Sequence, residues 1–218
     1  MADPAQLPDL ASLRAEYGDA GLDELAADPD PWVQWRAWFD DAVAAALHEP
    51  NAMVVATVDA GGQPSARTVL LKGVGPDGFR FFTNTASRKG AALAAHAGCA
   101  LLFPWHPLER QVRVEGLAVP LPEEDVAAYF ASRPRGSQLG AWASPQSQVV
   151  AGRDELDVRY REVEERFAGQ DVPVPPEWGG YRVVPAVFEF WQGRRGRLHD
   201  RLRYTADGEG WTIERLAP

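Results

Sequence analysis

The segment 197–204 carries a basic or titratable side chain at every second position. Side chains of a β-strand alternate between its two faces, so a strand over 197–205 would place these four on one face: Arg197, His199, Arg201 and Arg203. The other face would carry Leu198, Asp200, Leu202 and Tyr204. A row of cations repels itself and persists only where solvent or an anionic ligand neutralises it. A solvated edge strand explains the row equally well. The neighbouring Trp191 and the histidine favour a ligand that is both flat and charged.

A second anion site is predicted at 83–89, with the sequence Thr-Asn-Thr-Ala-Ser-Arg-Lys, where a strand passes into a helix. The free backbone N–H groups of a helix start favour an anion, and the adjacent Arg88 and Lys89 strengthen this preference. Thr83 and Ser87 add hydroxyl groups. The alternative is that Ser87 merely caps the helix and the two basic residues are solvated.

Two further groups of residues could bind phosphate. Arg67 and Lys72 interrupt an apolar strand, where charges are costly unless they are paired. Because they are five positions apart, they are expected on opposite faces unless a bulge intervenes. Each could instead extend to solvent at one end of the strand. Tyr129 and Arg133 share a helix face near Ser137, although an ordinary helix end explains this group as well.

The remaining polar candidates suit a heterocyclic ring. Gln111, Gln146 and Ser147 could bind carbonyl groups and ring nitrogens, and surface polarity would explain them equally well. No metal-ligand spacing is found among the four histidines, and Cys99 is the only cysteine. No nucleophile elbow and no glycine-rich dinucleotide motif is present. This inventory is typical of an enzyme whose cofactor performs redox chemistry while the protein orients the reactants.

Composition limits the class of protein. The 218 residues carry a net charge of −9 with a pI near 5.0, which argues against nucleic-acid binding and, with the local basic clusters, favours a small anionic ligand. The single cysteine precludes an internal disulfide and fits a reducing cytoplasm. No apolar run approaches the length of a membrane span, and no signal peptide is recognised.

The chain is expected to form an acidic mobile arm over 1–28 and one domain over 29–218. A short helical turn is predicted near 10–17. Asp30 and Pro31 predict the N-cap and first residue of an amphipathic helix containing Trp32, Trp35, Phe39, Val43 and Leu47. Further helices are predicted over 87–97, 123–132 and 151–167. Strands are predicted over 52–58, 65–74, 79–83, 100–105, 111–119, 181–191, 197–205 and 211–216. Short strands joined by tight turns favour an antiparallel barrel over a doubly wound sheet.

Together these segments resemble the pyridoxamine/pyridoxine 5′-phosphate oxidases over about 13–218. The matching pieces, in chain order, are Arg67-x-x-Leu70-Leu71-Lys72, Phe82-Thr83-Asn84, Ser87-Arg88-Lys89, Leu102-Phe103-Pro104-Trp105, Glu109-Arg110-Gln111-Val112, Ser132-Arg133-Pro134, Glu189-Phe190-Trp191-Gln192, Arg197-Leu198-His199-Asp200-Arg201 and Arg215-Leu216-Ala217-Pro218. The resemblance implies a mainly β, FMN-binding split β-barrel with flanking α-helices. It also implies a homodimer whose active sites are shared between subunits.

The resemblance also implies roles for individual residues. FMN contacts are expected from Arg67, Thr68, Val69, Leu70, Leu71, Lys72, Phe82, Thr83, Arg88, Lys89, Gln111, Gln146, Ser147, Trp191 and Arg201. The substrate phosphate is expected to contact Lys72, Tyr129, Arg133 and Ser137. Arg197 and His199 are the expected catalytic pair over the substrate ring, with Leu198 between them. Arg14 and Tyr17 resemble substrate contacts of a mobile N-terminal arm.

The implied reaction is oxidation of pyridoxamine or pyridoxine 5′-phosphate to pyridoxal 5′-phosphate. Hydride would pass to FMN, and dioxygen would be reduced to hydrogen peroxide. One alternative is a related split-barrel flavoenzyme, such as a phenazine-precursor oxidase or a deazaflavin-dependent reductase. Another is a non-catalytic module that binds a flavin or pyridoxal phosphate and consumes no oxygen. The paired Arg197 and His199 and the phosphate-binding set favour the oxidase.

Overall fold

A computed structural model describes residues 10, 12–13, 15–208 and 210–218. Its helices are α1 (Pro31–Ala44), α2 (Arg88–Ala95), α3 (Glu123–Ser132), α4 (Arg135–Ala143) and α5 (Arg153–Arg166), with short 3₁₀ turns η1 (His106–Leu108) and η2 (Arg195–Arg197). Its strands are β1 (Ala52–Val58), β2 (Pro64–Leu70), β3 (Gly73–Gly75), β4 (Gly78–Asn84), β5 (Gly98–Trp105), β6 (Arg110–Pro120), β7 (Trp178–Gln192), β8 (Asp200–Asp207) and β9 (Gly210–Arg215).

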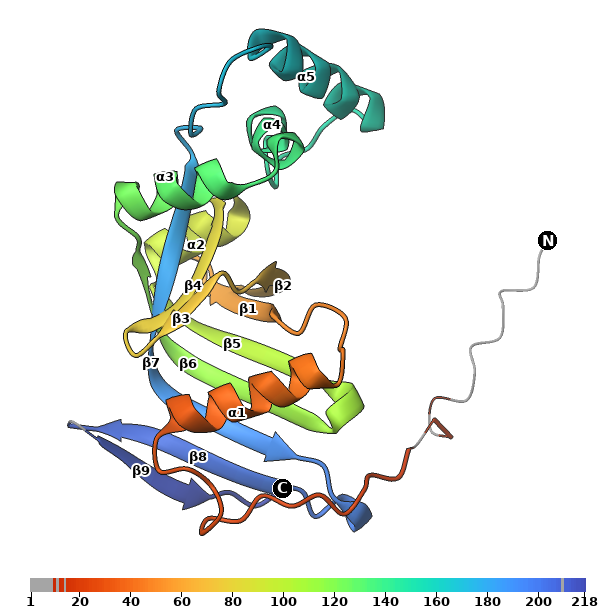
Figure 1. Ribbon diagram of the computed structural model, residues 1–218, viewed down its shortest axis with the longest axis vertical. Coiled ribbons are helices and arrows are strands. Elements are labelled where there is room, and N and C mark those ends of the chain that lie inside the picture. Colours follow the sequence, from red (N-terminus) through yellow and green to blue (C-terminus); the bar gives the residue numbers. More distant parts are fainter. Residues whose placement is uncertain (1–9, 11, 14, 209) are drawn as a thin grey trace.

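The strands form one antiparallel sheet that branches at the long strand β7. β6 pairs with β7 along most of its length, from Tyr181 to Gln192. On the other side of β7, β4 pairs with the first part, over 178–183, and β8 pairs with the last part, over 187–192. The sheet curls into a half-barrel, and Figure 1 shows β7 running from the helical end of the molecule to the β8–β9 hairpin. The expected antiparallel split-barrel architecture is confirmed.

The register between β6 and β7 shifts between Glu115 and Gly116, where Ala186 is an extra residue in β7, and such a bulge bends the strand that carries it. A Cβ atom on Gly116 would lie 2.1 Å from the carbonyl oxygen of Val184, so the close approach of the two backbones requires glycine there.

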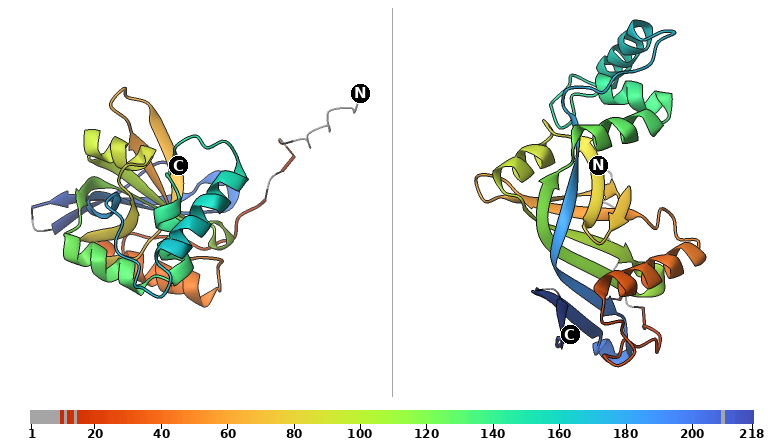
Figure 2. Two further views of the ribbon diagram at one scale, coloured as in Figure 1. Left: turned by 90° about the horizontal axis from the view of Figure 1, so that it is seen from above. Right: turned by 60° about the vertical axis from the view of Figure 1, so that its left-hand side comes forward.

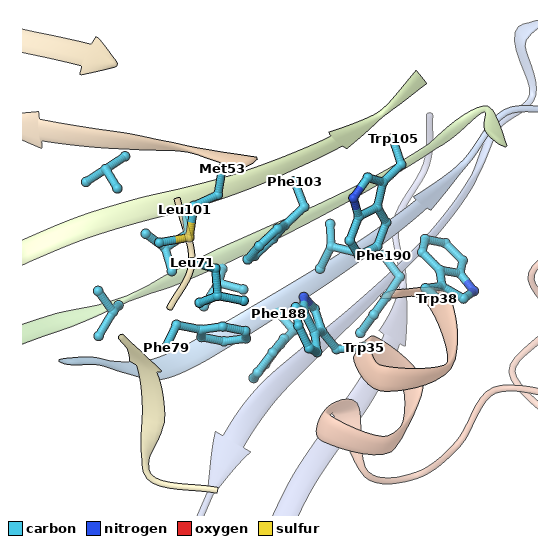
Figure 3. Close-up of a cluster of buried hydrophobic side chains, with 14 of the residues drawn as sticks. Trp35, Trp38, Met53, Leu71, Phe79, Leu101, Phe103, Trp105, Phe188 and Phe190 are labelled. Carbon is cyan, nitrogen blue, oxygen red and sulfur yellow. The ribbon is translucent and has the colours of Figure 1, made fainter. Parts of the chain in front are cut away.

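Helix α1 closes one face of the sheet. Asp30 caps it by accepting the Trp32 backbone N–H at 2.9 Å, and Pro31 is its first residue, as the sequence predicted. Trp35 and Trp38 pack against aromatic side chains of the sheet, including Phe188 and Phe190 (Figure 3). Two residues of the predicted apolar face depart from it. Val43 is exposed because the buried stripe turns through Trp38 and Ala42 instead, and Leu47 lies beyond the helix, which ends at Ala44.

A second, smaller core lies under α3, α4 and α5, at the end of β7 opposite the β8–β9 hairpin (Figure 2). Phe130, Leu139, Phe167 and Val172 form this core. Among the described residues, no helix is long and apolar enough to cross a membrane.

Several predicted segments differ from the structure. The strand predicted over 65–74 is interrupted after Leu70, where the Leu71 side chain enters the core. The strand predicted over 197–205 begins only at Asp200, because Gly196 and Arg197 both adopt positive φ in η2. The segment after Pro134 was not predicted to be helical, yet it forms α4, with Pro134 at its N-cap position.

Candidate active site

A cavity of about 360 Å³ lies between the ends of β2 and β4, helix α2 and the end of α3. Most of the residues predicted to hold FMN or the substrate phosphate meet here. Its lining consists of Arg67, Thr68, Val69, Leu70, Lys72, Phe82, Thr83, Lys89, Tyr129, Arg133, Gln146 and Trp178. Arg67 and Lys72 were expected on opposite faces. They reach the same cavity because the strand breaks between them.

The charge of the cavity lining is suited to an anion. Arg67, Lys72, Lys89 and Arg133 contribute four cationic side chains, and no aspartate or glutamate is among the described residues that line it. Like charges held together outside bulk water repel one another, so this arrangement is stabilised when a negatively charged group binds between them.

Lys89 is the most enclosed of these cations, with 9% of its surface exposed. Its ammonium group donates to Gln146 Oε1 at 2.6 Å, to Thr83 Oγ1 at 2.8 Å and to Ser87 Oγ at 3.3 Å. All three partners are uncharged. Burial, with a smaller contribution from the charge of Arg67, lowers the pKa of Lys89 to about 8. Within the part of the chain that the structure describes, Lys89 is therefore a cation without a counter-charge.

Arg67 is held rigidly on the neighbouring strand. Its guanidinium donates to the carbonyl oxygen of Val55 at 3.1 Å, to Thr57 Oγ1 at 2.8 Å and to Ser65 Oγ. Burial, followed by repulsion from Arg88, lowers its pKa, although an arginine stays protonated. These hydrogen bonds to β1 and β2 therefore fix the positive charge of Arg67 on the side of the cavity that faces Lys89.

The wall of the cavity formed by Arg133 and Trp178 contains two polar atoms that have no hydrogen-bond partner among the described residues. The guanidinium of Arg133 lies 4.2 Å from the ring centre of Trp178, and burial lowers its pKa. Neither Arg133 Nη1 nor Trp178 Nε1, both buried, has a hydrogen-bond partner among the described residues. A buried donor without a partner is costly, so a ligand that accepts hydrogen bonds from these atoms would stabilise this wall. Nearby, Tyr129 stacks on Phe82 at 3.8 Å between ring centres, and burial raises the pKa of its phenol.

A second group of predicted residues meets at the far end of β7. The Tyr17 ring lies edge-on to Trp191 and His199, with ring centres 5.8 and 5.2 Å away. The Arg197 guanidinium lies over the Tyr17 ring at 5.4 Å. We call Tyr17, Trp191, Arg197 and His199 the ring cluster.

The backbone fixes the orientation of this cluster. The Arg194 N–H donates to His199 Nδ1 at 3.1 Å, so a neutral His199 carries its proton on Nε2. Burial, followed by repulsion from Arg197, lowers the pKa of His199 below its usual value. Arg197 itself has φ +64°, a conformation that is rare for a residue with a side chain and is concentrated at functional sites.

The remaining basic residues of the predicted row are neutralised within the chain. Arg201 makes a two-pronged contact with the buried carboxylate of Glu189, at 3.0 and 3.1 Å, and donates to the carbonyl oxygen of Ala217 at 2.8 Å. Arg203 pairs with Glu214 at 2.7 Å. The sequence analysis expected solvent or a ligand opposite these cations, and the structure supplies carboxylates instead.

The cavity and the ring cluster lie at opposite ends of one strand. Trp178 borders the cavity and begins β7, whereas Trp191 belongs to the cluster near its end. The thirteen steps between them correspond to about 40 Å along the strand at about 3.3 Å per residue. One chain therefore does not bring the two groups to the same small ligand.

Other predicted residues lie around these two groups. Ser137 lines an adjoining cavity of about 250 Å³ together with Arg133, Gln146 and Trp178. Arg88 points outward, with its guanidinium 4.0 Å from Asp59. Ser147 and Leu198 are both exposed, and Ser147 has φ +71°. Gln111, in β6, is paired with Trp191 in β7. Arg14, and part of the helical turn predicted near 10–17, lie outside the described residues.

The sequence analysis missed Trp178 and Glu189 as functional candidates. Trp178 follows a proline-rich segment and precedes the strand predicted over 181–191, so it was assigned to no element, whereas β7 begins with it. Glu189 was quoted only as part of a motif, although a glutamate inside an apolar strand is itself a signal that a cation lies nearby.

Comparisons with known proteins identify the family of this chain. Residues 39–167 match the family model described as pyridoxamine 5′-phosphate oxidase, and residues 178–218 match the pyridoxine 5′-phosphate oxidase C-terminal dimerisation region. A pyridoxine/pyridoxamine 5′-phosphate oxidase from a Nocardioides species is 62% identical over 96% of this chain and 98% of its own length. One from Rubrobacter xylanophilus is 59% identical over 96% of this chain and 97% of its own.

Solved structures show the same fold. PhzG from Burkholderia lata, in complex with tetrahydrophenazine-1-carboxylic acid, superposes with a TM-score of 0.86 at 29% identity, covering 94% of this chain and 100% of its own. A pyridoxamine 5′-phosphate oxidase-related, FMN-binding protein from Nostoc punctiforme superposes with a TM-score of 0.68 at 18% identity, covering 84% of this chain and 97% of its own. The chain belongs to the pyridoxine/pyridoxamine 5′-phosphate oxidase family, and it is an oxidoreductase.

Proposed function

We propose that this enzyme oxidises pyridoxamine 5′-phosphate and pyridoxine 5′-phosphate to pyridoxal 5′-phosphate with FMN as cofactor, reducing dioxygen to hydrogen peroxide. The observation that carries the proposal is the cavity in which Arg67, Lys72, Lys89 and Arg133 converge without a lining carboxylate. Two phosphate esters, one on the cofactor and one on the substrate, would supply the missing negative charge. Relatives 52–62% identical to this chain carry the name of this activity.

The residues around Lys89 fit the FMN phosphate. Arg67 and Lys89 are fixed by neutral hydrogen-bond partners and still need a counter-ion. Thr83, Gln146 and the backbone of 68–70 offer further polar groups at the cavity wall. When bound, FMN would supply the acceptor for the hydride lost from the exocyclic carbon of the substrate, and dioxygen would reoxidise it.

The residues around Arg133 fit the substrate phosphate. Arg133 has a buried Nη1 with no partner, and Lys72 and Tyr129 line the same wall. Ser137 adds a hydroxyl from the adjoining cavity. A guanidinium, an ammonium, a phenol and a hydroxyl together can bind all the oxygens of a phosphate ester.

The ring cluster supplies the groups proposed to position the reacting carbon. Arg197 is cationic, and a neutral His199 presents its Nε2–H, because Nδ1 is occupied by the Arg194 N–H. These two groups would hold the substrate ring in near-contact with the cofactor, which a hydride transfer requires. Arg14 and Tyr17 of the N-terminal arm are proposed as further substrate contacts, and Gln111, Trp191 and Arg201 as contacts to the flavin.

A homodimer with shared active sites would join the two groups. They lie at opposite ends of β7, so a second copy running in the opposite direction would place its ring cluster against the cavity of the first. The match of residues 178–218 to a dimerisation region supports this arrangement.

The similarity to PhzG makes a tetrahydrophenazine carboxylic acid the second candidate substrate. Such a compound carries a carboxylate rather than a phosphate and would leave part of the cation set unneutralised.

One experiment separates these possibilities. The purified protein is loaded with FMN, its flavin spectrum is recorded, and oxygen uptake and peroxide formation are followed with each substrate. We expect turnover with both phosphorylated vitamers, and much slower turnover with unphosphorylated pyridoxine and with a tetrahydrophenazine carboxylic acid. A protein that stays colourless after incubation with FMN, or that prefers the phenazine compound, would refute the proposal. A coloured protein without oxygen uptake would indicate a non-catalytic binding module.

A further inference from the structure

Glu109 links two segments that are distant in the sequence. It follows the 3₁₀ turn η1 and adopts φ +57°, with its backbone N–H bonded to the carbonyl oxygen of His106 at 2.8 Å. Its carboxylate Oε2 accepts the backbone N–H of Gly18 at 2.8 Å, across 91 positions of the chain. A left-handed backbone at a residue with a side chain is uncommon, and here it directs the carboxylate toward the N-terminal segment.

The backbone of Glu109 holds the end of β7 at the same time. Its carbonyl oxygen accepts the N–H of Gly193 at 2.7 Å and the side-chain amide of buried Gln192 at 3.3 Å. One residue therefore fixes both the segment that carries Tyr17 and the strand end that carries Trp191.

Gly193 leaves the space that the Tyr17 ring fills. A Cβ atom at position 193 would lie 2.8 Å from Tyr17 Cδ1 and 3.0 Å from the Cβ atom of Glu109. Gly193 is buried and its φ is not positive, so conformational freedom is not what this position requires. The absence of a side chain there allows Tyr17 to lie against Trp191 and His199.

From these contacts we infer that Glu109 is a positioning residue that seats Tyr17 on the ring cluster and thereby shapes the substrate side of the active site. This inference rests on the proposed function, in which the ring cluster contacts the substrate. Glu109 acts through Gly18 and Gly193 and touches neither the reacting atoms nor the cavity.

The other contacts of the arm make the effect of Glu109 local. Leu22 donates its N–H to Asp200 Oδ2 at 3.0 Å, Glu24 pairs with Arg215, and Tyr204 donates to the carbonyl oxygen of Asp28. These contacts hold the arm beyond residue 21 without help from Glu109. Loss of the Glu109 carboxylate should therefore release the region around Tyr17 while the remainder of the arm stays in place.

The first test measures the contact itself and does not depend on activity. Hydrogen exchange of the Gly18 amide is measured in the FMN-loaded enzyme and in Glu109→Ala and Glu109→Gln variants, together with chymotrypsin cleavage after Tyr17. We expect exchange and cleavage to become about tenfold faster in Glu109→Ala, the order expected for loss of one hydrogen bond to a charged acceptor. Glu109→Gln keeps an acceptor oxygen and should restore most of the protection.

The second test measures the consequence for the substrate. We expect Glu109→Ala to raise KM for pyridoxine 5′-phosphate about three- to tenfold, with FMN affinity unchanged and kcat changed less than KM. Gly193→Ala should raise KM as well, because the added methyl displaces the Tyr17 ring. The matched control is Asp19→Asn, which removes an exposed ion pair of the same segment with Arg195, 3.3 Å long, and should leave KM at its wild-type value.

The inference requires both faster exchange of the Gly18 amide and a raised KM in Glu109→Ala. An unchanged KM in Glu109→Ala would overturn the inference, whether or not the Gly18 amide exchanges faster. A raised KM without faster exchange at Gly18 would also overturn it. A wild-type enzyme that oxidised neither vitamer would refute the proposed function instead, and the exchange measurement would then decide by itself whether Glu109 seats Tyr17.

Discussion

The backbone N–H of Arg194 donates a hydrogen bond to Nδ1 of His199 at 3.1 Å. This contact decides which nitrogen of the neutral imidazole is protonated, because Nδ1 is an acceptor and the proton must reside on Nε2. It also orients the ring toward Trp191, 4.6 Å away between ring centres. A backbone group thus presents His199 as a hydrogen-bond donor beside the cation of Arg197.

Arg197→Ala should change both the acidity of His199 and turnover. Burial is the main cause of the lowered pKa of His199, and the charge of Arg197 adds to it, so the variant should raise this pKa part of the way toward about 6.5. NMR titration of the imidazole measures the change. We also expect turnover to fall while FMN stays bound, because Arg197 is proposed to position the substrate ring. Normal oxidation of pyridoxine 5′-phosphate by the variant would exclude this role.

The lowered pKa of His199 also makes the free energy of unfolding depend on pH, and the sign of this dependence is known. In the folded protein His199 has a lowered pKa, so between that value and about 6.5 the unfolded chain binds more protons than the folded one. Its contribution to the free energy of unfolding is therefore complete above about pH 6.5 and is lost as the pH falls. Urea unfolding of His199→Asn, compared with wild type at several pH values, would isolate this contribution.

Lys89 should make FMN binding depend on pH. Its pKa is about 8, mainly because of burial and then because of Arg67, so the ammonium loses its charge as the pH rises through that value. FMN affinity should fall above about pH 8, measured by flavin fluorescence quenching. The apoprotein should instead gain stability between about pH 8 and about 10.4, because the unfolded chain then holds the extra proton. Lys89→Met should remove both dependences, and a wild-type affinity that is flat through this range would contradict the assignment.

Lys72→Ala and Arg133→Lys should weaken substrate binding. Lys72 lines the cavity with an exposed side chain, so Lys72→Ala should mainly raise KM, with FMN affinity intact. Arg133 lies over Trp178, and lysine cannot reproduce its planar stacking and paired donors. We expect KM to rise about tenfold in Arg133→Lys, and a wild-type KM would remove Arg133 from the substrate phosphate site.

Mixing two defective variants tests the shared active site. Lys72→Ala damages the cavity group, and Arg197→Ala damages the ring cluster at the opposite end of β7. If each site uses both subunits, a hybrid dimer holds one intact site and one doubly damaged site. A randomised equal mixture should then recover about a quarter of wild-type activity at low substrate concentration, because half of the dimers are hybrids with one of two sites intact. Recovery no greater than the sum of the two variants would exclude sharing.

Tyr204→Phe should reduce stability without altering the active site. The fully buried Tyr204 donates to the carbonyl oxygen of Asp28 at 2.8 Å, and this burial raises the pKa of its phenol to about 12. Removing the hydroxyl leaves that carbonyl without its partner and should lower the free energy of unfolding by about 1–2 kcal/mol. Chemical unfolding of both proteins measures the difference, and an unchanged midpoint would show that solvent replaces the hydroxyl.

Local signals in the sequence were sufficient for most of the fold. The cap formed by Asp30 and Pro31, the Ser87 cap of α2 and the apolar run of β1 depend only on residues within one turn or one strand. For the same reason, motifs around 67–72, 83–89 and 129–137 were sufficient to propose candidate anion-binding residues, most of which line one cavity. Each of these patterns is determined by neighbours two to four positions away.

The predicted strand boundaries were wrong where the backbone departs from the conformation that the local sequence favours. The strand expected over 197–205 begins at Asp200 because Arg197 has a positive φ, which a residue with a side chain adopts only under tertiary constraint. The strand expected over 65–74 breaks where Leu71 turns into the core, and that break brings Lys72 to the same cavity as Arg67.

The sequence by itself determined most of the helices and strands, and it proposed which side chains could bind phosphate. Only the tertiary structure decided their partners: Glu189 beside Arg201, Glu109 beneath Gly18, and the cavity and ring cluster at opposite ends of β7. Those pairings depend on strand register and on the bulge at Ala186, which join positions tens of residues apart. Local propensities do not contain this information, because the free energy that selects a register comes from burying the whole sheet at once.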